Sequence, residues 1–273
     1  MCVVAFAWNA HPRWRLVLAG NRDEFHARPT AALARWDDAA VSGGRDLEAG
    51  GTWLGDDGRC ALVTNVRDLR APQHGLSRGL LASDWLRGDA SAPASAEALL
   101  ARAEAYRPFN LLLFDRHEGR WLGNHPAARL QPLRAGVHAL SNAELDTPWP
   151  KTRALAARLQ DWLDASQRDA GDVAASADDR PAAGAPHDAA TAFAPLFAAL
   201  ADPTVHPDAD LPDTGIGLER ERWLSSAFIR GTDYGTRAST VVALAHDGGV
   251  MIERRWGPDG IALGETTLAL PIM

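Results

Sequence analysis

The stretch CVVAFAW (Cys2–Trp8) opens the chain as an unbroken apolar run, and WRLVLAG (Trp14–Gly20) follows it after the polar turn Asn9–Pro12. Short apolar runs bounded by turn residues are typical of buried strands rather than of helices. The sequence therefore predicts an N-terminal hairpin. That hairpin places the second residue of the chain, a cysteine, inside a sheet.

The order of the remaining strands and helices indicates the fold class. A second hairpin, Gly50–Gly55 with Arg59–Asn65, is predicted because the Asp57-Gly58 step between its strands suits a tight turn. Other predicted strands are Phe109–Asp115, Arg120–Gly123, Val137–Ser141, Arg222–Arg230, Arg237–Ala245 and Val250–Trp256. Predicted helices are Ser77–Arg87, Ser95–Tyr106, Trp149–Leu163 and Thr191–Ala201. Hairpins near both ends with helices between them favour an α+β fold of largely antiparallel sheet.

We interpret the chain as a single domain, residues 1–273, that carries one insertion. Residues 164–190 consist largely of Ala, Asp, Pro and Gly and contain almost no large apolar side chain. This composition predicts a disordered or mobile surface insertion. The other segments supply apolar residues for a sizeable core, since 46% of the chain is hydrophobic.

Composition and charge exclude several classes of protein. No apolar run reaches the roughly 18 residues of a membrane span. The formal net charge is −7 and the arginines are scattered, which argues against a nucleic-acid groove. Only two cysteines occur and no leader pattern is visible, so a reducing, cytoplasmic setting is expected. Phosphate-loop, serine-elbow and zinc-protease motifs are missing, and the histidines do not fall at metal-ligand spacing, so we expect no metal site.

Cys2 is the most informative residue of the chain. If the initiator Met is removed, which is usual when the second residue is small, a thiol and an α-amino group share the first residue. An α-amino group has an ordinary pKa near 7.7–8.0, so part of it is neutral at physiological pH and can accept the thiol proton. N-terminal nucleophile enzymes use this pairing of nucleophile and base. The alternative is that Cys2 is simply a small, buried strand residue.

Polar residues at strand ends add candidates for the same site. Arg22 and Asp23 follow the second strand, where an arginine near the thiol would favour thiolate and a carboxylate could orient the amino group. Asn65 and Asn142 each end an apolar strand and could donate to a developing oxyanion, although capping of turns is the commoner use of Asn there. Arg237 begins RASTVVALA and could bind a carboxylate, or it could be a surface arginine.

Several short motifs together resemble one family. They are M-C-x-V-x-F at the start, Asn21-Arg22-Asp23-Glu24, Gly43-Gly44-Arg45-Asp46, Gly50–Gly55, Thr64-Asn65-Val66-Arg67, Ser77-Arg78-Gly79, Phe109–Leu112, Gly123-Asn124-His125, Leu140-Ser141-Asn142, Leu145–Lys151 and Tyr234-Gly235-Thr236-Arg237. On these motifs the chain resembles the NRDE family, which includes the transport and Golgi organisation protein two group.

That family is similar to the N-terminal nucleophile hydrolases of the choloylglycine and penicillin amidase branch. The similarity implies an αββα sandwich in which Cys2 is the nucleophile, Asn65 and Asn142 are oxyanion donors, and Arg237 lies in the active site. Arg22 and Asp23 match the residues that flank the thiol. The hydrolase pattern Gly-Arg-Asn-x-Asp differs from Gly20-Asn21-Arg22-Asp23-Glu24, so either Asp23 or Glu24 could face the amino group, and Asn21 and Glu24 are candidates for binding ligand.

Two functions remain open from the sequence. The first is an N-terminal cysteine amidohydrolase that cleaves a small-molecule amide and requires no cofactor. The second is a non-catalytic protein that binds and carries haem or an acyl-CoA or other lipid, which the family resemblance also implies. Ten tryptophans, Trp53 among them, could line a ligand cleft, and His125 could be an axial haem ligand. The oligomeric state is not indicated by the sequence.

Overall fold

The computed structural model describes residues 2–71, 74–174 and 191–271. Its first sheet contains β1 (Cys2–Trp8), β2 (Trp14–Phe25), β10 (Gly136–Leu140), β11 (Tyr234–Ala245), β12 (Gly248–Trp256) and β13 (Ala262–Leu270). Its second sheet contains β3 (Thr30–Arg35), β4 (Ser42–Asp46), β5 (Leu54–Asp56), β6 (Cys60–Asn65), β7 (Phe109–Phe114), β8 (Gly119–Gly123) and β9 (Arg129–Pro132). The strand orders are β10-β1-β2-β11-β12-β13 and β3-β4-β5-β6-β7-β8-β9.

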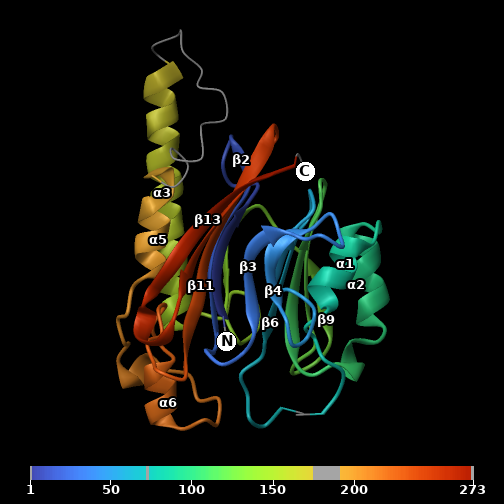
Figure 1. Ribbon diagram of the computed structural model, residues 1–273, viewed down its shortest axis with the longest axis vertical. Coiled ribbons are helices and arrows are strands. Elements are labelled where there is room, and N and C mark those ends of the chain that lie inside the picture. The colour runs from blue at the N-terminus through green and yellow to red at the C-terminus, as the bar shows by residue number, and fades with distance from the viewer. Residues whose placement is uncertain (1, 72–73, 175–190, 272–273) are drawn as a thin grey trace.

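The two sheets pack face to face, and each is covered by helices on its outer side (Figure 1). The helices α3 (Pro150–Ala174) and α5 (Ala194–Leu200) cover the first sheet, and α1 (Leu81–Arg87) and α2 (Ala92–Leu100) cover the second. A short helix, α6 (Leu218–Trp223), lies near the end of the sandwich where β1 begins. Short 3₁₀ turns occur at Ala103–Ala105, Asp208–Asp210 and Pro258–Gly260. The layers are therefore αββα, as the family resemblance implied.

Strand β1 lies in the interior of this sandwich and is buried along its whole length. Its side chains alternate between two cores, as successive residues of a strand must. Val4, Phe6 and Trp8 belong to the core between the sheets. Val3, Ala5 and Ala7 belong to the core under α3 and α5. Because both faces are covered, β1 shows the continuous apolar run from which it was predicted.

The polar segment that follows Gly20 continues β2 instead of ending it. Asn21 is paired with Ser239 and Asp23 with Thr236 on the neighbouring strand β11. Ser239 Oγ donates to Asn21 Oδ1 at 2.6 Å, and Thr236 Oγ1 donates to Asp23 Oδ1 at 2.7 Å. The predicted strand end at Gly20 is therefore wrong by five residues, because polar partners across the ladder satisfy these buried side chains.

The prediction of a strand over Arg222–Arg230 is also wrong. Residues of this segment form the end of α6 and an irregular stretch after it. The charged run Glu219–Arg222 consists of good helix formers, and Leu224, Phe228 and Ile229 bury their side chains without joining a sheet. An apolar run alone does not distinguish a strand from a buried loop.

Residues 164–174 of the predicted insertion belong to α3, which continues eleven residues beyond the predicted helix end. Three of these eleven residues are Ala, the residue with the highest helix propensity. The rest of the insertion, 175–190, lies outside the described residues. Helix α1 begins at Leu81 instead of the predicted Ser77, and α2 begins at Ala92 instead of Ser95, with Ser91 as a cap that accepts from Ala94 N.

Strands β3, β4, β9 and β13 were not predicted. Sequences such as SGGRD carry no alternation of apolar and polar residues, and they become strands by pairing with their neighbours. None of the helices within the described ranges is both long and apolar enough to cross a membrane.

The core between the sheets supplies a direct test of the fold. Leu62 on β6 is fully buried there, whereas Leu47 is 57% exposed. Replacing Leu62 by Ala should lower the free energy of unfolding by about 2–5 kcal/mol, because the lost side chain leaves a cavity. The matched change Leu47→Ala should shift it by no more than about 0.5 kcal/mol. Urea unfolding measures both, and equal losses would contradict the packing described.

Candidate active site

Cys2 lies at the start of β1, between β10 and β2. It is 6% exposed and directly opposite Arg22 of β2. Opposed residues of an antiparallel pair point to the same face of the sheet, so the thiol and the guanidinium both face the second sheet. They line a cavity of about 340 Å³, which we call the thiol cavity, together with Glu24, Asn65, Arg78 and Arg237 and other residues of both sheets.

Burial raises the pKa of the Cys2 thiol, and the nearby Asp23 carboxylate adds to the rise. Arg22 and a backbone hydrogen bond from Asp23 act in the opposite direction, because both favour the thiolate. Burial has the largest effect, so the resting group at neutral pH is the uncharged thiol. Any chemistry at this sulfur therefore requires a base that accepts its proton.

Asp23 lies on the opposite face of β2 from Arg22, toward α3. Burial raises the pKa of Asp23, and the amino-terminal charge, Lys151 and the hydrogen bond from Thr236 partly offset that rise. The side chain of Glu24 points into the thiol cavity, where its Oε2 is 3.8 Å from Arg22 Nη2 and its Oε1 accepts from Phe25 N. Asp23 also borders the cavity, but strand alternation turns its side chain toward Lys151.

Lys151, at the start of α3, was not among the predicted site residues. Its side chain is buried, and Nζ donates to the Leu224 carbonyl at 3.0 Å. Burial lowers its pKa to about 8, although the nearby Asp23 carboxylate opposes the shift. The sequence did contain a signal, because Lys151 is the single lysine among 28 basic residues.

Asn65 and Asn142 come together from different sheets. Asn142 Nδ2 donates to the Asn65 backbone carbonyl at 2.9 Å and to Asn65 Oδ1 at 3.0 Å. Both N–H groups of the Asn142 amide are thereby used, and Asn142 is fully buried. Asn65 Nδ2 makes only a long contact of 3.5 Å to the Val66 carbonyl, and Asn65 lines the thiol cavity. Asn65 is the amide that can donate to a ligand, and Asn142 orients it.

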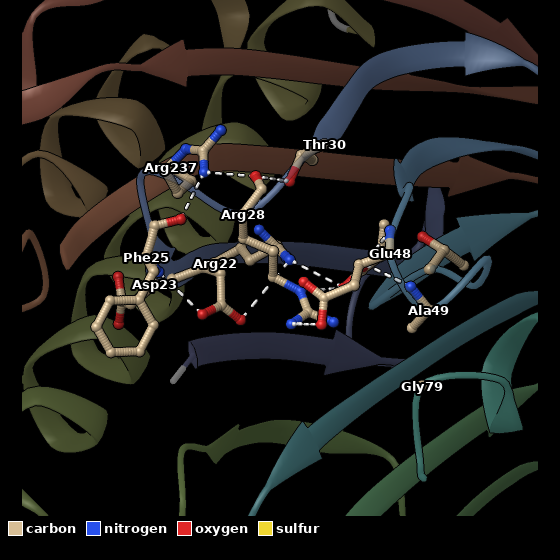
Figure 2. Close-up of polar contacts among 12 residues, drawn as sticks. Arg22, Asp23, Phe25, Arg28, Thr30, Glu48, Ala49, Gly79 and Arg237 are labelled. Atoms are coloured by element: carbon tan, nitrogen blue, oxygen red, sulfur yellow. Dashed lines mark hydrogen bonds and ion pairs between the residues drawn. The ribbon is translucent and has the colours of Figure 1, made fainter. Parts of the chain in front are cut away.

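Arg237 is the extra residue of a bulge in β11, where the register with β2 shifts between Thr236 and Ala238. A bulge re-aims a side chain, and here the guanidinium turns toward the chain that leaves β2. Arg237 Nη1 donates to the carbonyls of Phe25 and Arg28 at 2.8 and 3.2 Å (Figure 2). Arg237 therefore lines the cavity and also anchors the backbone that forms its wall.

The remaining predicted residues are divided between the cavity and other places. Trp53 lines the thiol cavity. Asn21 is fully buried on the other face of β2, where Nδ2 donates to the carbonyls of Leu200 and Ala227 at 2.8 Å. His125 lies elsewhere, with Nε2 3.2 Å from the Asp68 carboxylate. Within the described residues, no group of three or more His, Cys, Asp or Glu side chains that could hold a metal ion is found. The absence of a metal site stays a prediction.

A second cavity of about 820 Å³ adjoins the thiol cavity. We call it the aromatic cavity, because Phe25, Trp223 and Tyr234 form part of its wall. It shares Glu24, Asn65 and Arg78 with the thiol cavity. Sequence reasoning missed it, since its walls come from α6, β2 and the start of β11, which are far apart along the chain.

The chain belongs to the Transport and Golgi organisation 2 family, whose family model matches residues 1–258. This confirms the resemblance based on the NRDE motifs. The chain is 32% identical over 277 residues to the Transport and Golgi organization protein 2 homolog of Bos taurus, covering 93% of this chain and 92% of that protein. The Homo sapiens homolog is 29% identical with the same coverage.

Among solved structures, the chain is similar to a Caenorhabditis elegans N-acylethanolamine-hydrolyzing acid amidase ortholog. The match has a TM-score of 0.41 and 14% sequence identity, and it covers 59% of this chain and 79% of that chain.

The pKa of Lys151 makes stability depend on pH in a defined direction. In the unfolded chain its pKa is near 10.5, so between pH 8 and 10.5 the unfolded state binds more protons than the folded state. The free energy of unfolding that this group contributes therefore rises with pH across that window, by roughly 3 kcal/mol. Lys151→Met removes the effect, so wild type should gain stability relative to this variant as pH rises from 7.5 to 10.

Urea unfolding of both proteins at several pH values checks this expectation. Arg153→Met, an exposed basic position on the same helix, is the matched control and should differ from wild type by a constant amount. A Lys151→Met difference that does not change with pH would contradict a lowered pKa at this site.

Proposed function

We propose that this chain is an N-terminal cysteine amidohydrolase that cleaves the C–N bond of a small-molecule amide. One observation carries the proposal: the thiol of residue 2 lies at a cavity wall, with the Arg22 guanidinium opposite and the Asn65 amide on the same cavity. A thiol that served only to fill the core would need neither of these groups. The αββα layers, with Cys2 at the start of an interior strand, support the same function.

The base is the α-amino group of Cys2, once Met1 has been removed. Burial keeps the thiol protonated, so the amino group has to accept its proton as the sulfur forms a bond to the amide carbonyl carbon. When the C–N bond breaks, that proton passes to the leaving nitrogen and a thioester remains on Cys2. Water then attacks the thioester carbonyl and gives a proton to the amino group. The C–S bond breaks, the carboxylic acid leaves, and the proton returns to the sulfur. The Asp23 carboxylate orients the amino group from the opposite face of β2.

The oxyanion of each tetrahedral intermediate receives a hydrogen bond from Asn65 Nδ2. Donors of this kind contribute about 2.7–4 kcal/mol to transition-state stabilisation in a known acyl-transfer enzyme. Asn142 acts through Asn65, because it fixes the orientation of that amide by donating to Oδ1. Arg22 supplies positive charge where the sulfur becomes negative. No cofactor enters this scheme.

The chemistry also suggests a compartment. Cys2 and Cys60 are both free thiols in the described structure. A thiol nucleophile is preserved where glutathione and thioredoxin keep cysteines reduced, so we include a cytoplasmic location in the proposal.

Ligand carriage is the second candidate function, and the aromatic cavity favours it. A cavity of about 820 Å³ with aromatic walls suits the apolar part of a ligand and does not depend on Cys2. Of the two ligands considered, an acyl-CoA fits this role better than haem. His125 lines neither cavity, so it offers a haem no axial ligand there.

The first test is turnover in Cys2 variants of untagged protein. The intact mass should be that of the chain without Met1, and a panel of amides should include a substrate that wild type cleaves. Cys2→Ala should abolish this cleavage without changing the urea midpoint, whereas Cys60→Ala, at the other buried thiol, should retain it. Retention of Met1, or turnover by Cys2→Ala, would refute the mechanism. Saturable binding of acyl-CoA without any turnover would favour carriage.

The second test concerns the two asparagines. Asn65→Ala should lower kcat by about 10²–10³-fold, the usual cost of losing an oxyanion donor. Asn142→Ala should lower kcat less, and the double variant should be no slower than Asn65→Ala, because Asn142 acts only by orienting Asn65. Steady-state kinetics of the three variants measure this. Additive losses would mean that Asn142 contacts the substrate itself.

A further inference from the structure

The thiol cavity carries a surplus of positive charge in a chain that is acidic overall. Seven arginines line it against four carboxylates, while the whole chain has a formal charge of −7. Low-dielectric walls concentrate such a local field and raise the local concentration of an oppositely charged ligand. Such a field favours anionic ligands, provided that some of the arginines have no carboxylate partner in the protein.

The carboxylates of the cavity are already engaged by protein groups. Asp46 Oδ2 accepts from Arg28 Nε at 2.7 Å and from Arg22 Nη2 at 3.4 Å. Glu253 Oε1 accepts from Leu33 N at 2.8 Å. Glu24 is held by Phe25 N, as described above. These acids neutralise Arg28 and part of Arg22. Arg45 is paired with Asp38 at 2.9 Å, and Arg237 is held by backbone carbonyls.

Arg78, Arg107 and Arg255 are the arginines that stay available, and the first two lie close together. No hydrogen bond or ion pair joins the side chain of Arg78 or Arg107 to any residue in the described ranges. Arg78 is half-buried, and its guanidinium lies close enough to those of Arg107 and Arg28 to repel them. Burial lowers the pKa of Arg78, and the charge of Arg107 lowers it further. Two like charges held together and partly desolvated are stabilised by an anion that binds between them.

A buried donor in the same cavity also lacks an acceptor. Arg22 has a side chain only 9% exposed, and its Nη1 has no hydrogen-bond partner among the described residues (Figure 2). A buried donor without a partner costs about 1–3 kcal/mol, or more when it is charged. Such a cost is tolerated at a site where a bound ligand supplies negative charge.

Arg78 brings positive charge close to both Asn65 and the aromatic cavity. Arg78 lines both the thiol cavity and the aromatic cavity, and the same is true of Asn65. A ligand whose carbonyl reaches Asn65 can therefore extend apolar groups into the aromatic cavity while its charged group meets Arg78. Both cavities together define a ligand that is apolar at one end and anionic at the other.

We propose that Arg78 and Arg107 bind an anionic group of the substrate, a carboxylate or a phosphate, and that the scissile amide joins this group to an apolar one. The substrate class rests on the proposed amidohydrolase function, but the anion site itself does not. Arg78 is the specificity-determining residue, because it is the half-buried one. Arg107 is exposed and strengthens the field at the cavity mouth.

Equilibrium binding to the Cys2→Ala protein tests the site without any turnover. The probes are dodecanoate, dodecyl phosphate and the uncharged dodecanol, each below its micelle-forming concentration and followed by calorimetry. At least one anion should bind saturably and ten or more times tighter than dodecanol, and its Kd should rise with added salt. The two anions distinguish a carboxylate site from a phosphate site. Equal affinity for dodecanol, or no saturable binding of either anion, would overturn the proposal.

Variants assign the effect to Arg78. Combined with Cys2→Ala, Arg78→Met should weaken anion binding about tenfold or more and leave dodecanol binding unchanged, whereas Arg78→Lys should keep part of the affinity. Arg102→Met, at an exposed arginine outside both cavities, is the matched control and should change nothing. Urea midpoints verify that each variant is folded. Undiminished anion binding by a folded Arg78→Met protein would contradict the assignment, whether or not the wild-type protein hydrolyses amides.

Discussion

The hydrogen bonds that cross between the two sheets at the Cys2 end constrain everything else at this site. Asn142 Nδ2 donates to Asn65, the Asn142 carbonyl accepts from Arg67 N at 2.7 Å, and Thr64 Oγ1 donates to the Ser141 carbonyl at 2.9 Å. Ser141 Oγ then donates to the Cys2 carbonyl at 2.8 Å. Apolar packing alone would let two sheets slide, whereas directional bonds between buried groups fix the distance from the thiol to the Asn65 amide.

Alternation along β2 divides the charges around Cys2 into two groups with different roles. Arg22 and Glu24 face the cavity beside the sulfur, whereas Asp23 faces α3 and the buried Lys151. Burial keeps the thiol uncharged, and the same burial lowers the pKa of Lys151 to about 8. The site thus holds its charges in a low-dielectric interior before any ligand arrives. Preorganised charge of this kind stabilises a developing anion without the cost of reorganising water.

Much of this arrangement could be predicted from the sequence. The apolar run Cys2–Trp8 predicted both ends of β1 correctly, because a strand that is covered on both faces is apolar along its whole length. Family membership was predicted from short polar motifs spread along the chain, and the family model over residues 1–258 confirms it. Lys151 was missed, since a buried lysine in a helix has no local pattern, and only its rarity in the chain marked it. The strand predicted over Arg222–Arg230 failed because its apolar residues pack as a loop, a tertiary outcome that periodicity does not encode.

Net charge also proved a poor guide to the cavity, and the reason is physical. A value of −7 is summed over a whole surface, whereas a ligand in a cavity experiences the few charges within about a Debye length of roughly 8–10 Å. Scattered arginines in the sequence argued against an extended nucleic-acid surface, whereas the fold brings seven of them around one thiol. Hydrolysis and ligand carriage would both use that field and the adjoining aromatic cavity. They differ in whether the Cys2 sulfur attacks what is bound, and under the proposed mechanism that depends on whether removal of Met1 exposes the Cys2 amino group as the base.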